Sequence, residues 1–306
     1  MNSPVKHHFS PAFSLQPWTR SDGLLCEIRR INGRVVASRK HPNATGFEKN
    51  LYRTEGVPAD QEQDLEVNFM RPLDTAADRA LKKIMSGDPT PWDDEERSAW
   101  TRYILSLIFR NPAAVRVIKD RIYDIWDEGL KALEANYTER RQSTDPATFE
   151  EYLAQRRPAA AQIHATNLIT EIIDNPRLGP TIMNMHWSRI DVSRSNVTLL
   201  NSDRPIDKPL GLSDRLAYIA FPIGPKTLFL ASNDSTLANR ISREKNQTKL
   251  AKLMNKVVVG QAQEFVWGMD DSQLTFVQRY MGTIPEREIV TAKQHQEAIE
   301  AARGHS

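Results

Sequence analysis

The sequence predicts an α+β protein in which a mainly helical middle segment packs against a mostly antiparallel sheet. Two strand-like runs within residues 24–38 flank Asn32-Gly33, the pair that best tolerates the backbone of a tight hairpin turn. Apolar residues recur at three- and four-residue spacing from Val115 to Leu133, as they do on one face of a helix. Within residues 186–231, short strand-like runs alternate with proline and glycine turns. These three observations together predict the fold class.

The remaining elements follow within one expected domain, residues 1–284. Residues 61–174 are expected to form a helical block, broken or kinked at Pro72 because proline lacks the amide donor. Strands are expected at 186–192, 197–200, 216–223 and 226–231, and we expect them to share one sheet with the hairpin. Helices are expected within 246–281, the first of them from 249 to 267. Residues 285–306 are polar and are expected to form a C-terminal helix or a frayed tail.

The composition excludes several classes of protein. Hydrophobic residues make up 40% of the 306 residues and charged residues 26%, which is ordinary for a folded chain. The single cysteine, Cys26, excludes an intramolecular disulfide and fits a reducing compartment. No apolar run approaches the roughly 20 residues that span a bilayer, and residues 1–17 lack the apolar core of a secretory signal. We therefore expect a cytoplasmic protein that does not bind membranes. The net charge of +2 leaves nucleic acid possible as a partner without indicating it.

Familiar catalytic motifs are absent from the sequence. The chain has no glycine-rich phosphate loop, no H-E-x-x-H and no G-x-S-x-G, and its seven histidines are scattered. The spacing predicts no metal site and identifies no cofactor.

Three short groupings contain the candidate catalytic residues. His8 lies among aromatic residues and prolines, and it is either a general acid or base or a histidine that hydrogen-bonds the backbone. Asp203 follows an expected strand, beside Asn201, and it is a base, a metal ligand, the partner of a cation, or part of a turn that bonds its own backbone. Arg110 ends an expected helix, where it holds a carboxylate or phosphate or caps the helix.

Other groupings suggest binding residues. His164, Asn167 and Glu171 share one face of an otherwise apolar helix, and this strip is either the wall of a polar pocket or the solvated side. Basic and aromatic residues alternate at 18–20, at 186–189 around Trp187, and at 278–280. That combination holds single-stranded nucleic acid in some proteins, although tryptophans are also ordinary core residues.

The order of the motifs resembles a large, uncharacterised bacterial family, the domain of unknown function number four-two-three-eight. Members open with His, an aromatic residue, any residue and Pro, as His8-Phe9-Ser10-Pro11 does, before Leu15 and Trp18. Arg110-Asn111-Pro112 is similar to the family's Arg-Thr-Pro, from which Asn111 departs, and Ser202-Asp203-Arg204-Pro205 matches its Ser-Asp-x-Pro turn. Further similarities are Lys40 to Pro42, Leu51-Tyr52, Trp187, Pro222-Ile223-Gly224-Pro225 and Asn255. The resemblance spans about residues 6–268 and implies polar family positions at His8, Arg110 and Asp203. It implies no particular reaction, substrate or cofactor.

Two functional hypotheses follow. The first is a hydrolase acting on a phosphodiester or another polar substrate, with His8 as the acid or base, Asp203 as the second ionisable group, and Arg110 or Lys226 stabilising negative charge. Its substrate-binding residues would be His164, Asn167, Asn201, Trp187 and Lys226. The second is a non-catalytic binding or regulatory protein in which the same residues form a structural polar network.

Overall fold

The computed structural model describes residues 5–285 and 292–304 and confirms the α+β class, with an N-terminal hairpin and a helical middle. The hairpin consists of β2 (Leu25–Ile31) and β3 (Arg34–Lys40). Asn32 and Gly33 take φ angles of 48° and 78° at its turn, which is the conformation that the Asn-Gly pair predicts. A small separate sheet consists of β1 (Lys6–His8) and β4 (Phe47–Lys49), which precede and follow the hairpin in the chain.

The hairpin belongs to a four-stranded sheet of order β3-β2-β9-β6. Strand β9 (Phe265–Gly268) pairs with β2 on one side and with β6 (Asn201–Ser202) on the other. The expectation of a helix reaching residue 267 was therefore wrong at its end. Helix α9 (Gln247–Gln261) stops before Ala262, and the apolar run that follows it is a buried strand.

A second sheet has the order β5-β8-β7, so the strands do not share the single sheet that the sequence suggested. Its strands are β5 (His186–Asp191), β7 (Tyr218–Gly224) and β8 (Thr227–Ser232). The strand expected at 197–200 is absent. The backbone nitrogens of this segment form hydrogen bonds outside a strand ladder: Leu199 N donates to Pro225 O, and Leu200 N donates to the Asn255 side chain.

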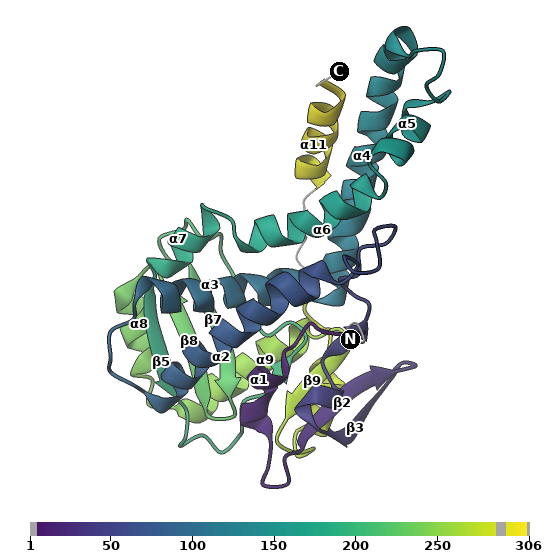
Figure 1. Ribbon diagram of the computed structural model, residues 1–306. Coiled ribbons are helices and arrows are strands. Elements are labelled where there is room, and N and C mark those ends of the chain that lie inside the picture. The colour runs from purple at the N-terminus through teal and green to yellow at the C-terminus, as the bar shows by residue number, and fades with distance from the viewer. Residues whose placement is uncertain (1–4, 286–291, 305–306) are drawn as a thin grey trace.

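The helical block begins with a π-helix, Leu65–Met70, which passes into α2 (Arg71–Ser86) at the point where Pro72 predicted a break. Helix α3 (Asp94–Phe109) starts with a capping box of Asp93 and Glu96, and α4 (Pro112–Arg140) begins at the next proline. Helices α5 (Phe149–Arg156), α6 (Ala160–Ile173) and α7 (Leu178–Met183) complete the block. The outer part of α4 and α5 extends as an arm, and α11 (Ala292–Gly304) packs against α4 (Figure 1).

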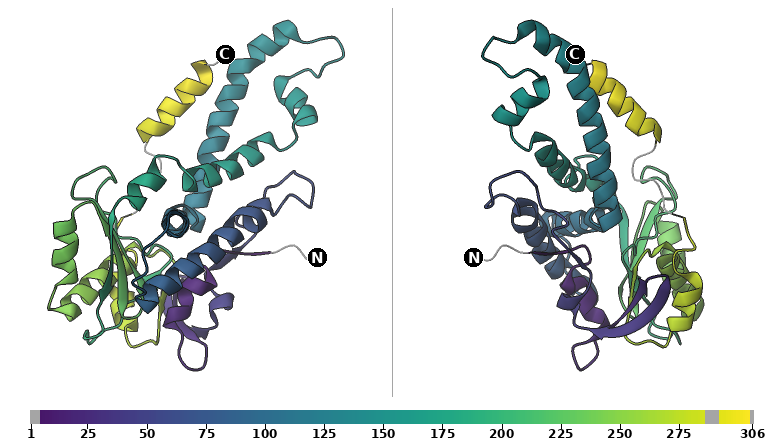
Figure 2. Two further views of the ribbon diagram at one scale, coloured as in Figure 1. Left: turned by 60° about the vertical axis from the view of Figure 1, so that its left-hand side comes forward. Right: turned by 90° about the vertical axis from the view of Figure 1, so that its right-hand side faces the viewer.

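Helices cover both faces of the second sheet (Figure 2). Alternate residues such as Phe221 and Phe229 pack with Trp100 of α3, whereas Leu228 and Leu230 pack with α9 and with α8 (Ser235–Ser242). Helix α10 (Leu274–Tyr280) lies over the first sheet, close to β3. No helix within the described residues combines the length and the apolar content that crossing a membrane requires.

Candidate functional site

Arg110 is the centre of a buried polar network. Its side chain is fully buried at the end of α3, and both of its terminal nitrogens donate to the Asp74 carboxylate of α2, at 2.8 and 2.9 Å. The same nitrogens donate to Ser106 Oγ at 3.1 Å and to the backbone oxygen of His8 at 2.9 Å. Although burial opposes the charged form, the Asp74 carboxylate raises the pKa of Arg110 above its usual range. Arg110 therefore joins α2, α3 and β1 through a permanent charge.

Two further groups in this network were not among the sequence candidates. The Tyr52 hydroxyl donates to the backbone oxygen of Arg110 at 3.0 Å. Glu66 lies on the π-helix and is buried, and burial raises the pKa of its carboxyl against the opposing charge of Arg110. Asp74 and Glu66 carry no motif of their own. The family-like Leu51-Tyr52 pair was the sequence signal that could have identified Tyr52.

His8 meets the network through its backbone rather than its ring. The ring packs edge-on against Phe47, and its Nε2 is buried without a hydrogen-bond partner among the described residues. Burial, and then the positive charge of Arg110, lower the pKa of His8 to about 4, while a backbone hydrogen bond with Asn43 opposes the shift. The imidazole of His8 is consequently neutral at pH 7.

Asp203 is held by the backbone that leads into β9. Its two carboxylate oxygens accept hydrogen bonds from the backbone nitrogens of Gln263, Glu264 and Phe265, at 3.1, 2.8 and 3.1 Å. Burial raises the pKa of Asp203 to about 6, and the three backbone hydrogen bonds oppose that shift. The turn at residues 202–205 is thus fixed to the start of β9.

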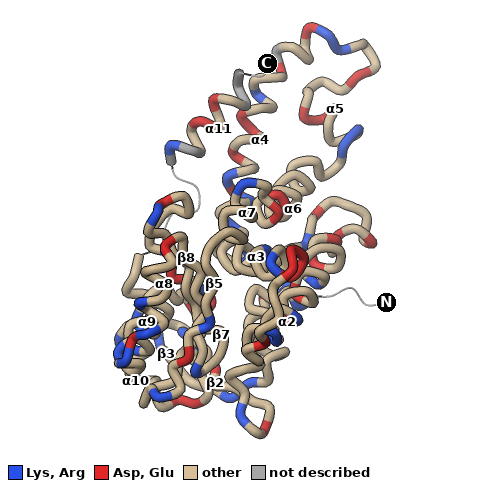
Figure 3. The backbone as a smooth tube through the Cα atoms, turned by 90° about the vertical axis from the view of Figure 1, so that its left-hand side faces the viewer, with Lys and Arg blue, Asp and Glu red and all other residues tan. Residues whose placement is uncertain are grey.

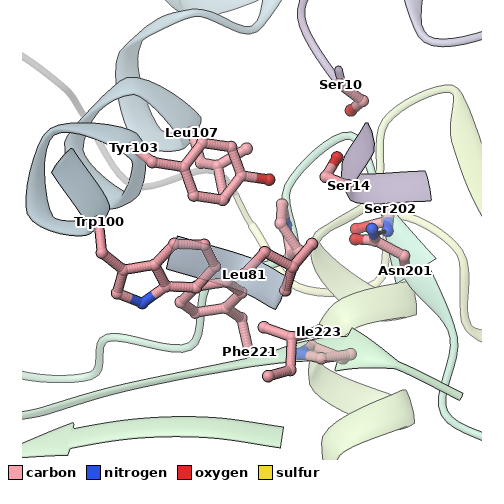
Figure 4. A pocket seen from close by; sticks show the side chains of 12 residues that line it. Ser10, Ser14, Leu81, Trp100, Tyr103, Leu107, Asn201, Ser202, Phe221 and Ile223 are labelled. Atoms are coloured by element: carbon pink, nitrogen blue, oxygen red, sulfur yellow. Dashed lines mark hydrogen bonds between the residues drawn. The ribbon is translucent and has the colours of Figure 1, made fainter. Parts of the chain in front are cut away.

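A small internal cavity lies between α3 and the second sheet. Its free volume is about 10 Å³, which is room for about one water molecule. Figure 4 shows Ser10, Ser14, Asn201 and Ser202 gathered on one side of it, with the Tyr103 hydroxyl pointing towards them from the other side. Asn201 Oδ1 already accepts from the backbone nitrogen of Ser202 at 2.8 Å. The cavity is too small for a substrate.

A much larger, open pocket of about 430 Å³ lies beyond Leu107 and Pro205, which line both spaces. Two of the family-like segments meet there, because Asn111 and Arg204 both contribute to its wall. The charged residues among those that line it are Arg204 and Lys208, both cationic, and the apolar side chains form most of the surface. The full lining comprises Leu105, Leu107, Ile108, Phe109, Asn111, Leu178, Arg204, Pro205, Ile206, Lys208, Leu212, Ser213, Gln261, Ile284 and Pro285.

One glycine permits the packing at the rim of this pocket. A Cβ at Gly260 would lie 2.7 Å from two carbon atoms of Ile284, and the backbone nitrogen of Ile284 donates to Gly260 O at 2.9 Å. Only a residue without a side chain lets the 282–285 segment lie this close to α9. Gly260 therefore sets the position of one wall.

The other candidate residues lie apart from this pocket. His164 and Asn167 are exposed on α6, where Asn167 lines a separate pocket of about 250 Å³ beside the π-helix. Trp187 packs under the guanidinium of Arg97, 4.0 Å from its ring centroid, and donates to Ile182 O at 3.0 Å. Lys226, in the turn between β7 and β8, donates to Ser195 O at 2.8 Å.

The described residues contain no group of three or more His, Cys, Asp or Glu side chains able to hold a metal ion. What the arrangement offers chemically is a rigid, charged interior and an adjacent open pocket with an apolar wall and two cations. The Asp203 carboxylate, which neighbours Arg204 in the chain, accepts hydrogen bonds from backbone nitrogens.

Comparison with known proteins places the chain in one family. A family model described as "Protein of unknown function (DUF4238)" matches residues 6–272, which include the hairpin, the helical block and both sheets. No curated protein and no solved structure matches the chain. Because the matched residues are most of its 306, the chain belongs to the DUF4238 family of proteins of unknown function.

Proposed function

We propose that the protein binds a small amphipathic anion, an apolar chain or ring that carries a carboxylate or a phosphate, in the 430 Å³ pocket. The observation that carries the proposal is the meeting of the Arg110–Pro112 and Ser202–Pro205 segments at an open pocket of ligand size. Pockets for small molecules are concave, mostly apolar, and supplied with a few polar groups that fix orientation. Leu107, Phe109 and Leu212 would cover the apolar body of the ligand, and Arg204 and Lys208 would face its anionic group.

A binding function fits the candidate catalytic groups, because the polar atoms of Asp203 and Arg110 already form hydrogen bonds within the protein. Asp203 directs both oxygens to backbone nitrogens, and Arg110 directs its terminal nitrogens to Asp74, Ser106 and the backbone of His8. With a pKa of about 4, His8 is almost never in the acidic imidazolium form at pH 7, and its neutral ring is a weak base. Hydrolysis of a phosphodiester by these three residues stays a prediction, and the geometry supports it less than binding.

Calorimetric titration with octanoate, octyl phosphate and octanol tests the proposal. The three probes share an apolar chain and differ in charge, so binding of the two anions but not of octanol is expected. Lys208→Ala should weaken octanoate binding at least about tenfold, because a hydrogen bond to a charged group contributes about 1.5–3 kcal/mol. Lys49→Ala removes an exposed lysine from β4 and should leave the affinity unchanged.

A second variant separates a blocked pocket from an unfolded protein. Ser213 is exposed at the pocket wall, so Ser213→Trp should fill the pocket and abolish binding without lowering the melting temperature. Equal affinity for octanoate and octanol, or unimpaired binding by Ser213→Trp, would overturn the proposal. Turnover of an aryl phosphodiester that is lost in His8→Gln and Asp203→Asn, but kept in Ser213→Trp, would support hydrolysis instead.

A further inference from the structure

Positive charge is concentrated on α8 and α9. The whole chain, by contrast, carries a net charge of only +2. Between residues 240 and 256 there are six lysines and arginines and one acidic residue, Glu244. Arg194 adjoins them, because its backbone nitrogen donates to the Gln247 side chain at the start of α9. Figure 3 shows the basic residues gathered along α9. We call this surface the basic face and define it as Arg194, Arg240, Arg243, Lys245, Lys249, Lys252, Lys256 and Arg279.

All eight cations of the basic face are exposed, and none of them forms a salt bridge with any described residue. Elsewhere the protein pairs many of its exposed cations, as Arg116 does with Glu48 and Arg102 with Asp174. Like charges placed together repel one another and raise the local potential, which attracts an anionic partner. The basic face is therefore suited to a polyanion.

The helix geometry arranges part of this charge as a row. Lys249, Lys252 and Lys256 are spaced by three and four residues, which places them within an arc of about 60° on α9. The row runs for about 10 Å along the helix, at 1.5 Å for each residue. Leu253 lies beside this row, about 40° outside the arc, and is 55% exposed, more than any other large hydrophobic residue described. The row thus combines charge with an apolar contact point.

An aromatic ring lies at the end of the row. Lys256 Nζ is 5.5 Å from the Tyr280 ring centroid, and the Arg279 guanidinium is 5.4 Å from the same ring. Phe276 packs against Tyr280 with a centroid distance of 4.8 Å, which holds the partly exposed ring in place. The alternation of basic and aromatic residues at 278–280 is thereby brought beside the lysines of α9.

We propose that the basic face binds single-stranded nucleic acid, with the lysine row of α9 along the phosphates and Tyr280 as a stacking platform for a base. Grooves and surfaces that hold single strands combine cations that follow the backbone with aromatic rings on which bases stack. A folded membrane-binding surface would need a broader apolar area than Leu253 alone provides. This inference is independent of the anion pocket, which uses none of these residues.

Fluorescence anisotropy with a labelled oligothymidylate of about 20 nucleotides tests the proposal, at low and at moderate salt. The variant Lys249→Ala/Lys252→Ala/Lys256→Ala should bind at least about tenfold more weakly. The slope of log K against log[salt] should become shallower by about 2, since each phosphate contact in a single strand contributes about 0.7. The control Lys49→Ala/Lys82→Ala/Lys131→Ala removes the same charge from exposed positions outside the basic face and should bind as the wild type does.

A second variant addresses the base contact. Tyr280→Leu should weaken binding of the single strand about tenfold while leaving weak binding of duplex DNA unchanged, because paired bases are not free to stack. Both lysine variants should melt as the wild type does, since their side chains are exposed. Equal affinity of the two triple variants for the oligothymidylate would overturn the proposal. So would binding to vesicles containing phosphatidylserine but not to the oligothymidylate.

Discussion

The stability of the protein should depend on pH through His8. In the folded protein, burial and the nearby Arg110 lower the pKa of His8 from 6.5 to about 4. The folded state therefore disfavours the protonated ring, and the contribution of His8 to stability is complete above pH 6.5 and is lost as the pH falls towards 4. At 1.36 kcal/mol for each pH unit, the loss amounts to at most about 3 kcal/mol.

The assay compares the free energy of unfolding in urea between pH 7 and pH 4 for the wild type and for His8→Gln. Glutamine does not titrate, so the variant should lose up to about 3 kcal/mol less than the wild type over this interval. His164→Gln is the matched control, because His164 is exposed on α6 and its replacement also removes one histidine. If His8→Gln lost as much stability as the wild type and the control, the ring of His8 would not be desolvated as described.

Three further changes test the packing around the site. Asp74→Ala leaves the buried charge of Arg110 without its partner and should cost about 3–5 kcal/mol in urea unfolding; a variant as stable as the wild type would refute the structural role of the pair. Gly33→Ala should lower the free energy of unfolding by about 1 kcal/mol. Gly33 has a φ of 78° and open space around it, so the substitution strains only the backbone. Gly33→Asn should lower the free energy of unfolding by less. Gly260→Ala should lower the melting temperature and weaken octanoate binding together, because its Cβ would displace Ile284; a loss of stability with unchanged affinity would show that the wall does not move.

Local sequence signals predicted the elements that are specified by neighbouring residues in the chain. The hairpin follows from Asn32-Gly33, and α3 follows from Asp93 and Glu96, which form its capping box. Strand β9 was missed because Phe265-Val266-Trp267 continues an apolar pattern directly from α9, and a short apolar run does not by itself distinguish helix from strand. What makes it a strand is its pairing with β2, more than two hundred residues earlier in the chain. That pairing carries no local signature.

Only part of the candidate site was predictable from the sequence. The family-like segments identified Arg110 and Asp203, and both are buried, charged and hydrogen-bonded. Their partners were not predictable, since Asp74 is 36 residues from Arg110 and the Asp203 carboxylate is bonded to backbone nitrogens that any sequence supplies. The pocket itself escaped prediction because its walls come from α3, α7, α9, the 204–213 loop and the 282–285 segment, and a concavity arises only when these are packed together.

The arrangement of the two segments separates residues that hold the pocket from residues that line it. Arg110 and Asp203 point into the protein and fix the ends of α3 and β6, whereas their neighbours Asn111 and Arg204 lie at the pocket wall. In each segment the charged residue is buried and the next residue lines the pocket, so one turn of chain both fixes the backbone and forms part of the wall. Because buried charges are costly to disrupt, changes at Arg110 should act on stability. Changes at Arg204 should act on affinity with the fold intact, since part of its side chain reaches solvent. If both positions altered stability alone, the pocket would be a gap in the packing and the binding proposal would fail.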